Sequence, residues 1–375
     1  MKKILLFILL ISFSLSNKMI TIPYSISFSQ NVVKVTIAFT NNYNYPDISL
    51  QSPLSYLLIN KQYYTKKGTE IFPIDNKPFE FELYQEEILI QGYKTKLAFY
   101  GGVNTEEKCR LCYSHLSFGF GQISKSTSFI YQLYNRREID KMIFGIYPFG
   151  SESGEIYIGD IPTHLIKDKP HGECSVYDNT WSCFISMIKF VNKYKGSTPN
   201  ILGRTFTARF STEHTTIKCS EEVFEYFKND IFKEAMDNNL CWVMYQNNLY
   251  CPSSTDKEKN KLFLLLPTHL ELVFNTMTLS IPFIHLFDNS KGIFLIESDK
   301  KVKPNEIILG YCFLQNYFTI FDYEKKSVSF YFPEEDKFFI TNTNKEEKDK
   351  DTRVLLLLIL TCILSLFSLL LIYNK

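Results

Sequence analysis

Two groups of residues have types and spacing suited to chemistry, and each group is incomplete. Cys109, Cys112 and His115 are spaced like ligands of a metal ion, but a zinc site needs four ligands and no second Cys/His pair is near. Ser211 and His214 are residue types of a serine hydrolase, yet no Gly-x-Ser-x-Gly motif surrounds a nucleophile. We therefore expect no metal and no cofactor, and a disulfide at Cys109 and Cys112.

The composition indicates a large, aromatic-rich β protein without a charge bias. The chain has 375 residues, of which 45% are hydrophobic and 16% aromatic, with 33 Phe and 24 Tyr. Such a chain can bury substantial cores, and its Phe, Tyr and Ile content favours sheet over helix. The formal net charge is +1, which gives no electrostatic reason to expect nucleic acid as a partner. We expect a monomer.

Both ends of the chain carry targeting signals. Residues 1–16 start with a basic pair and continue as an apolar run, as a signal peptide does. Residues 354–373 carry no charge and are long enough to span a bilayer. We therefore expect the secretory pathway and a single-pass type I anchor, at the cell surface or in an endomembrane lumen. A GPI signal is the alternative, with small residues at 341–344 and a polar spacer at 345–353.

The cysteines suit an oxidising compartment. Nine are present, and eight of them precede the predicted anchor, so an even number is available for disulfides. Cys241 and Cys251 are spaced to close a local hairpin, and Cys174 and Cys183 could do the same. The alternative for the second couple is a long-range pairing with a later cysteine, Cys219 or Cys312.

The apolar pattern predicts two β-rich halves, each with one short helix. Alternating apolar and polar residues predict strands within 20–39, 48–59, 79–99, 142–158, 181–190, 205–210 and 262–287. Helical spacing predicts helices over 127–136 and 220–233. The closing stretch, 307–331, predicts two strands joined by a polar turn at 324–326.

The order of these features resembles the pepsin-like aspartic peptidase family. Each half has an apolar step that ends in glycine, at 117–119 and at 308–310. Further segments match the family in order: FGFG at 118–121, IFGIYPFGSESGEIYIGDI at 143–161, WSCFISMIKF at 181–190 and LPTHLELVFNTMTLSIP at 266–282. The resemblance covers about residues 20–331 and implies an all-β, bilobal double β-barrel with a few short helices.

The resemblance also implies a division of the chain. The N-terminal lobe would span residues 17–178 and the C-terminal lobe residues 179–335. A charged stalk would follow at 336–353, ahead of the transmembrane helix at 354–373.

The family's chemistry needs two aspartates, each in an Asp-Thr/Ser-Gly motif, which share a proton. In this sequence Gln51 stands at the first aspartate position, with Pro53 in place of the glycine. Ser211 stands at the second, with Glu213 in place of the glycine. Neither Gln51 nor Ser211 supplies a carboxylate. A shift of register would bring in Asp47 or Glu213 as an alternative.

The resemblance therefore implies a catalytically degenerate, membrane-anchored member that binds a peptide or protein in the cleft between its lobes. Tyr84 matches the family's flap tyrosine, or is one strand aromatic among 24 Tyr. A divergent aspartic-type endopeptidase with a non-standard dyad is the alternative function. A structural or adhesive ectodomain with a filled cleft is the third.

Overall fold

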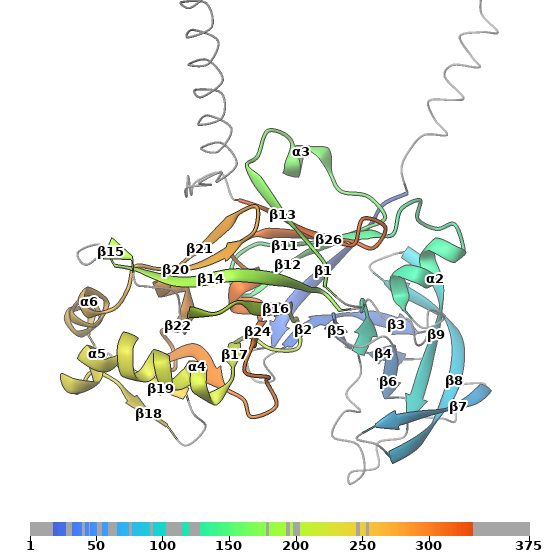
Figure 1. Ribbon diagram of the computed structural model, residues 1–375. Helices are drawn as coiled ribbons and strands as arrows, with labels where there is room; N and C mark the ends of the chain where they lie inside the picture. The colour runs from blue at the N-terminus through green and yellow to red at the C-terminus, as the bar shows by residue number, and fades with distance from the viewer. Residues whose placement is uncertain are drawn as a thin grey trace, which may run out of the picture.

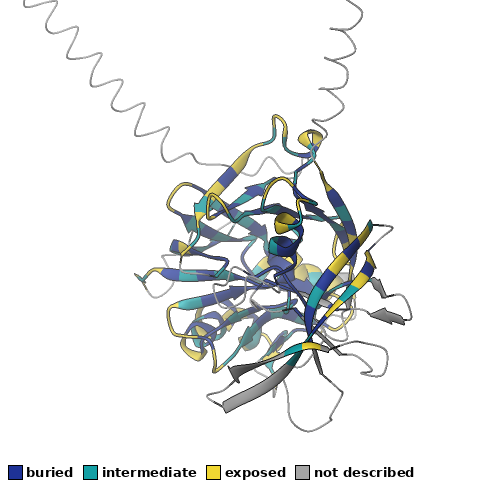
Figure 2. Ribbon diagram, turned by 90° about the vertical axis from the view of Figure 1, so that its right-hand side faces the viewer, coloured by how far each residue is buried: buried dark blue, intermediate teal, exposed yellow. Residues whose placement is uncertain are grey.

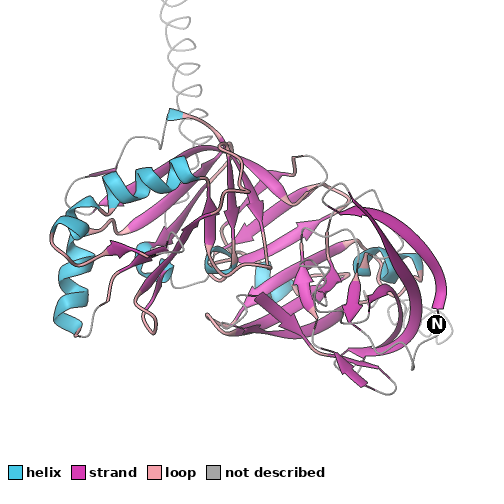
Figure 3. Ribbon diagram, turned by 90° about the horizontal axis from the view of Figure 1, so that it is seen from below, coloured by secondary structure: helices cyan, strands magenta, loops and turns pink. Residues whose placement is uncertain are grey.

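The computed structural model describes residues 18–27, 32–39, 42–44, 46–50, 55–58, 66–74, 77–90, 93–102, 115–119, 128–177, 180–192, 196–197, 203–244, 248–252 and 255–332. These residues form a mostly β molecule with two large sheets (Figure 1). Strands predominate over helices, and the longest helices lie at the outer end of one half (Figure 3).

The first sheet has 15 strands and is built mainly from the N-terminal half of the chain. Its strands are β1 (Ile20–Ser27), β2 (Val32–Val35), β3 (Ile37–Phe39), β4 (Asn42–Asn44), β5 (Asp47–Ser49), β6 (Tyr56–Leu58), β7 (Lys66–Ile74), β8 (Lys77–Ile90), β9 (Tyr93–Gly102), β10 (His115–Ser117), β11 (Ile143–Pro148), β12 (Ser153–Ile158), β13 (His171–Ser175), β25 (Phe318–Asp322) and β26 (Ser327–Tyr331).

The second sheet has 11 strands and comes from the C-terminal half. Its strands are β14 (Ser182–Asn192), β15 (Gly196–Ser197), β16 (Phe206–Phe210), β17 (Ile217–Cys219), β18 (Trp242–Val243), β19 (Asn248–Tyr250), β20 (His269–Phe274), β21 (Thr278–Pro282), β22 (Phe287–Asp288), β23 (Ile293–Ser298) and β24 (Glu306–Leu309).

Short helices connect the strands. They are α2 (Phe129–Asn135), α3 (Thr163–Ile166), α4 (Glu221–Tyr226), the π-helix η3 (Phe227–Ile231), α5 (Lys233–Asp237), α6 (Asp256–Leu265), the 3₁₀-helix η4 (Phe283–Leu286) and α7 (Tyr311–Leu314). Figure 1 shows α4, α5 and α6 at one end of the molecule and β7 to β9 at the other.

The closing hairpin of the chain joins the two halves. As the sequence predicts, β25 and β26 pair antiparallel, with Phe318 opposite Tyr331. β25 also pairs with β11, placing Phe144 opposite Phe321. The closing hairpin therefore lies in the same sheet as β1, between β13 and β11, and joins the two halves.

An aromatic core lies beneath this shared sheet. Phe144 stacks on Phe321 at 4.7 Å between ring centroids, and Trp181 lies edge-on to Tyr323 at 4.9 Å. The Trp181 indole and the Tyr323 hydroxyl both donate to the Phe118 carbonyl, at 2.8 and 2.9 Å. Buried residues run along the central strands, while exposed residues gather on outer loops (Figure 2). The core therefore fixes the end of β10, which borders the candidate site.

Helix predictions are partly confirmed. The helix expected over 127–136 is α2, and the helix expected over 220–233 is a run of α4, η3 and α5. The strand prediction over 262–287 is wrong at its start, because α6 continues to Leu265. A capping box begins α6: the Thr255 hydroxyl accepts from the Glu258 amide, and the Glu258 carboxylate accepts from the Thr255 amide. Helix α7 is a further element that the sequence pattern does not predict.

Two of the proposed cysteine pairs are present as local disulfides. Cys174 bonds to Cys183, and Cys241 bonds to Cys251. The alternative of a long-range pairing of Cys174 or Cys183 with Cys219 or Cys312 is therefore wrong. The remaining two cysteines in the described part of the chain, Cys219 and Cys312, are buried free thiols. Cys109 and Cys112 lie outside the described residues.

None of the helices that the structure describes is both long and apolar enough to cross a bilayer. The predicted signal peptide (1–16), stalk (336–353) and anchor (354–373) all lie outside that part of the chain, and they stay predictions.

Candidate functional site

The loop that follows β16 lies where the two sheets approach each other. β16 runs parallel to β24, with Phe210 opposite Leu309, and the loop over residues 211–216 then crosses Gly310. The amide of Tyr311 donates to the His214 carbonyl at 2.8 Å, and the amide of Cys312 donates to Thr215 at 2.9 Å. This loop is thus held by the first turn of α7.

Gly310 is required by that crossing. A Cβ atom at this position would lie 2.7 Å from the His214 carbonyl oxygen and in still closer contact with that of Thr216. Both neighbours are backbone atoms, which cannot rotate away. The glycine of the apolar-apolar-Gly step therefore lets the loop pass directly over α7, independently of any unusual φ angle.

A matching arrangement in the first sheet identifies the position equivalent to Ser211. In the first sheet β5 and β10 are parallel, with Ser49 opposite Ser117; in the second sheet β16 and β24 are parallel, with Arg209 opposite Ile308. Ser117 and Ile308 each lie two residues before the glycine of the apolar step, so Ser49 and Arg209 occupy equivalent positions. Two residues further along, Ser211 in the second half therefore corresponds to Gln51 in the first. Gln51 itself lies outside the described residues, so the correspondence rests on the strand registers alone.

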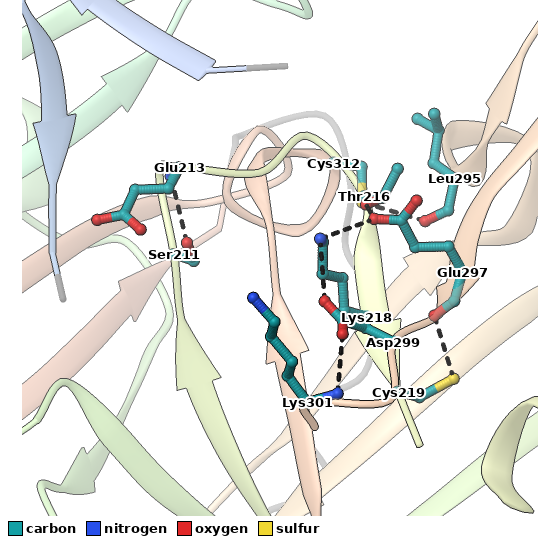
Figure 4. A network of polar contacts seen from close by, with 10 residues as sticks. All are labelled: Ser211, Glu213, Thr216, Lys218, Cys219, Leu295, Glu297, Asp299, Lys301 and Cys312. Atoms are coloured by element: carbon teal, nitrogen blue, oxygen red, sulfur yellow. Dashed lines mark hydrogen bonds and ion pairs between the residues drawn. The ribbon is translucent and has the colours of Figure 1, made fainter. Parts of the chain in front are cut away.

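Ser211 is buried at the end of β16. It is 1% exposed, and its amide donates to the Leu309 carbonyl at 3.0 Å. Its hydroxyl accepts a hydrogen bond from the Glu213 amide at 3.2 Å (Figure 4). Next to it, the Thr212 carbonyl accepts from the amide of Val33 at 3.1 Å. The loop is thus tied to strand β2 of the first sheet.

The side chain of Glu213 forms a hydrogen bond to the first half of the chain. Its carboxylate accepts a hydrogen bond from the hydroxyl of Ser49, the last residue of β5. Ser49 is fully buried, and Glu213 is half-buried. The side chain at the family's second glycine position therefore reaches the first half of the chain, two residues before Gln51.

A network of charges lies behind the loop on the second sheet. Lys218 lies between Glu297 and Asp299, with 3.3 Å from its ammonium to each carboxylate (Figure 4). The Thr216 hydroxyl donates to Glu297 at 2.7 Å. The amide of Lys301 and the ammonium of Lys218 hold the pKa of Asp299 below its usual value, against the opposing effect of burial. The single ammonium of Lys218 thus serves two carboxylates of the second sheet.

His214 is kept neutral by its surroundings. Burial lowers the pKa of its imidazole to about 4, and the positive charges of Lys218 and Arg209 act in the same direction. Asp299 opposes them. Among the described contacts no hydrogen bond joins His214 to Ser211, whose hydroxyl faces the Glu213 amide. The arrangement thus lacks the nucleophile–base contact of a serine hydrolase.

Tyr84 lies in the middle of β8, away from the turns at either end of the strand. It is opposite Lys66 in β7 and Phe99 in β9. Its side chain is 2% exposed, its ring stacks on Phe99 at 5.9 Å, and its hydroxyl donates to Glu82 at 2.7 Å. These contacts fit a strand aromatic, and the flap role stays a prediction without support from them.

The other candidate residues are separate from this loop. Asp47 is the first residue of β5, opposite His115 and Lys34, and so lies at the far end of that strand from Gln51. Ser49 carries no local sequence signal that marks it as a partner for Glu213.

A parallel strand pair in each sheet, β5 with β10 and β16 with β24, and a closing hairpin that joins the two halves fit the pepsin-like aspartic proteinase fold. The family model described as eukaryotic aspartyl protease matches residues 82–331, which is more than half of the chain. The chain belongs to the eukaryotic aspartyl protease family, and the resemblance seen in the sequence is confirmed.

A solved structure supports the same fold. The chain is similar to the aspartic proteinase from Irpex lacteus, with a TM-score of 0.61 and 13% sequence identity. The similarity covers 84% of this chain and 98% of that one. At this identity the likeness shows the fold alone. No curated protein sequence matches the chain.

Proposed function

We propose that this family member does not cleave peptides by the two-aspartate mechanism and instead binds a peptide or protein between its two halves. The observation that carries the proposal is the pair of equivalent positions Ser211 and Gln51, which follows from the strand registers. Neither side chain has a carboxyl group. Without two carboxylates no proton can be shared, and no water is activated between them.

The contact of Glu213 supports this proposal. Its carboxylate accepts from the Ser49 hydroxyl, so it takes part in a hydrogen bond that joins the halves. A dyad would need a second carboxylate within hydrogen-bonding distance. The nearest candidate in the sequence of the first half, Asp47, begins β5, whereas Ser49 ends it.

The fold of the family supports a role in binding. Two β lobes can hold an extended peptide by main-chain hydrogen bonds, with pockets for alternate side chains. This capacity depends on the shape of the lobes and not on the two aspartates. Loss of the dyad therefore leaves peptide binding available as a function.

We also propose that residues 1–16 direct the chain into the secretory pathway and that residues 354–373 anchor it in a membrane, with GPI attachment as the alternative. The disulfides Cys174–Cys183 and Cys241–Cys251 support an oxidising compartment. The chain would act as a monomer without a cofactor.

Peptide capture tests the binding function. The full chain, solubilised in detergent, is mixed with a peptide library, and retained peptides are eluted and identified by mass spectrometry. We expect a related set of sequences to be enriched, and Glu213→Arg to weaken their retention at least tenfold. Glu222→Arg is the matched control, because Glu222 is an exposed carboxylate in α4. Enrichment no greater than that on an unrelated membrane protein would contradict the proposal.

A divergent endopeptidase is the second candidate. Glu213 favours it, because this carboxylate belongs to the loop after β16 and reaches the first half. That function predicts cleavage at acid pH, with Glu213 as a member of an unusual dyad, and loss of cleavage in Glu213→Gln.

A further inference from the structure

The outer face of the shared sheet is apolar and only partly covered. All of Phe318 to Phe321 in β25 are buried, although alternate residues of a strand face opposite sides. Phe321 points into the main core against Phe144. Phe318 and Ile320 form a second cluster on the other side with Tyr157 and Leu165 of α3. Strands buried on both faces require a cover on each of them.

Helix α3 covers only part of this face and leaves a cavity beside it. The cavity has a volume of about 320 Å³, within the range of ligand pockets. Its lining includes five aromatic side chains and no carboxylate: Tyr147, Pro148, Gly150, Leu165, Lys169, Gln315, Asn316, Tyr317, Phe318, Tyr331 and Phe332. An occupant of this cavity should be apolar and should carry a negative charge near Lys169.

Lys169 is the one cationic residue of the lining. Within the part of the chain that the structure describes, its ammonium forms no ion pair, and the side chain is partly exposed. The carboxamide of Asn316 is engaged elsewhere, because its nitrogen donates to the Cys312 carbonyl at 2.8 Å. Lys169 therefore supplies an available positive charge at the cavity.

The last residue that the structure describes, Phe332, lies at this cavity. Phe332 is 4% exposed and lines it, and its amide donates to the Pro170 carbonyl at 3.3 Å, directly after Lys169. The residues that follow, 333–340, read Pro-Glu-Glu-Asp-Lys-Phe-Phe-Ile. Their order is acidic first and apolar second, which complements the ammonium and the aromatic lining in turn.

We propose that residues 333–340 fold back and cover this face, with the acidic residues 334–336 at Lys169 and the apolar residues 338–340 in the cavity. An extended chain reaches roughly 20 Å in six residues, which is sufficient for a cavity that Phe332 lines. The covalent connection makes the effective concentration about millimolar or higher, so weak contacts suffice. Docking leaves residues 341–353 as the spacer to the predicted anchor, and turns this face toward the membrane.

Hydrogen exchange measured by mass spectrometry on the full chain tests the proposal. In Phe338→Ser/Phe339→Ser, amides over 163–169 and 315–318 should exchange about tenfold faster than in the wild type. Leu264→Ser is the control, because Leu264 is 61% exposed on α6, away from the cavity. Unchanged exchange in β16 will show that the variants are folded.

A charge-swap experiment distinguishes loss of docking from a general loss of stability. Lys169→Glu should lose the same protection, and Glu334→Lys/Glu335→Lys introduced with it should restore protection. Equal exchange over 163–169 and 315–318 in wild type and the Phe338→Ser/Phe339→Ser variant would overturn the proposal. So would unprotected amides at 338–340 in the wild type, and the cavity would then be free for a separate anionic, apolar ligand. The test does not depend on whether the chain binds or cleaves peptides.

Discussion

At the scale of single residues, the hydrogen bond between Ser49 and Glu213 joins the loop over residues 211–216 to the first sheet. Ser211 could be predicted from the sequence, because it follows an apolar strand at the position of the family's motif. The partner of Glu213 could not, since Ser49 is 164 residues away and meets it only after both sheets have formed. A contact of that kind depends on the approach of the two sheets and leaves no local pattern.

Removing the Ser49 hydroxyl should destabilise the fold. Ser49→Ala deprives the half-buried Glu213 carboxylate of a hydrogen bond, which costs about 1.5–3 kcal/mol for a charged partner. A double-mutant cycle with Glu213→Gln, measured by denaturant unfolding, should give a coupling energy of about 1 kcal/mol or more. Ser290→Ala is the matched control, because Ser290 donates to Asp288 on the surface. Additive effects of Ser49→Ala and Glu213→Gln would refute the contact.

His214 should make the fold sensitive to acid. Burial holds its pKa at about 4 in the folded chain, whereas an unfolded histidine has a pKa of about 6.5. Between these values only the unfolded state gains a proton, so the free energy of unfolding falls as the pH is lowered from 6.5 to 4, by roughly 2–3 kcal/mol.

The variant His214→Gln removes this contribution. The difference in unfolding free energy between wild type and His214→Gln should therefore change with pH over that interval and be constant above pH 7. His164→Gln, at an exposed position in α3, is the matched control. A pH-independent difference for His214→Gln would show that the imidazole is not kept neutral.

At the scale of elements, most strands could be predicted from alternation, and the errors have a local cause. The apolar residues of 262–265 predict a strand, but this stretch is the end of α6. The helix begins at the polar residues Thr255 to Glu258, whose capping box is the signal that would have marked its start. α7 has only four residues, too few to show a helical period in the sequence. Its position is set by hydrogen bonds to the loop over residues 211–216.

Gly310 should not tolerate even a methyl group. In Gly310→Ala the new Cβ would lie against the backbone oxygens of Thr216 and His214, so α7 or the loop must move. We expect a loss of about 3 kcal/mol or more in the free energy of unfolding. Gly68→Ala is the control, because no other atom lies within 4 Å of the position that its methyl group would take. Equal stability of the two variants would contradict the close crossing.

The buried free thiols and the disulfide-bonded cysteines should differ in their reaction with alkylating reagents. Burial raises the thiol pKa of Cys219 and of Cys312, so neither should react with iodoacetamide in the native chain at neutral pH. Unfolding without a reductant should expose both thiols. The half-cystines Cys174, Cys183, Cys241 and Cys251 should react only after reduction, as read by peptide mass mapping. Native labelling of Cys312 would contradict its burial.

At the scale of the whole molecule, the shared strands keep the two halves in one structure. β25 and β26 are the last strands that the structure describes, and they lie in the same sheet as β1. Tyr24 of β1 and Tyr311 of α7 also join the halves through a hydrogen bond of 3.0 Å between their hydroxyls. The mostly β, pepsin-like fold could be predicted because the order of segments matches the family. The junction itself could not, because it combines residues from opposite ends of the sequence.

The most direct measurement is peptide cleavage by the full, solubilised chain between pH 3 and 7.5, read by mass spectrometry of a peptide library. The wild type and Glu213→Gln are run together, with Glu222→Gln as the matched control and circular dichroism as the check of folding. We expect no cleavage above the background of a buffer sample in any of the three, because Gln51 and Ser211 leave no dyad. Cleavage by wild type and Glu222→Gln that disappears in Glu213→Gln would contradict the account and establish a divergent peptidase.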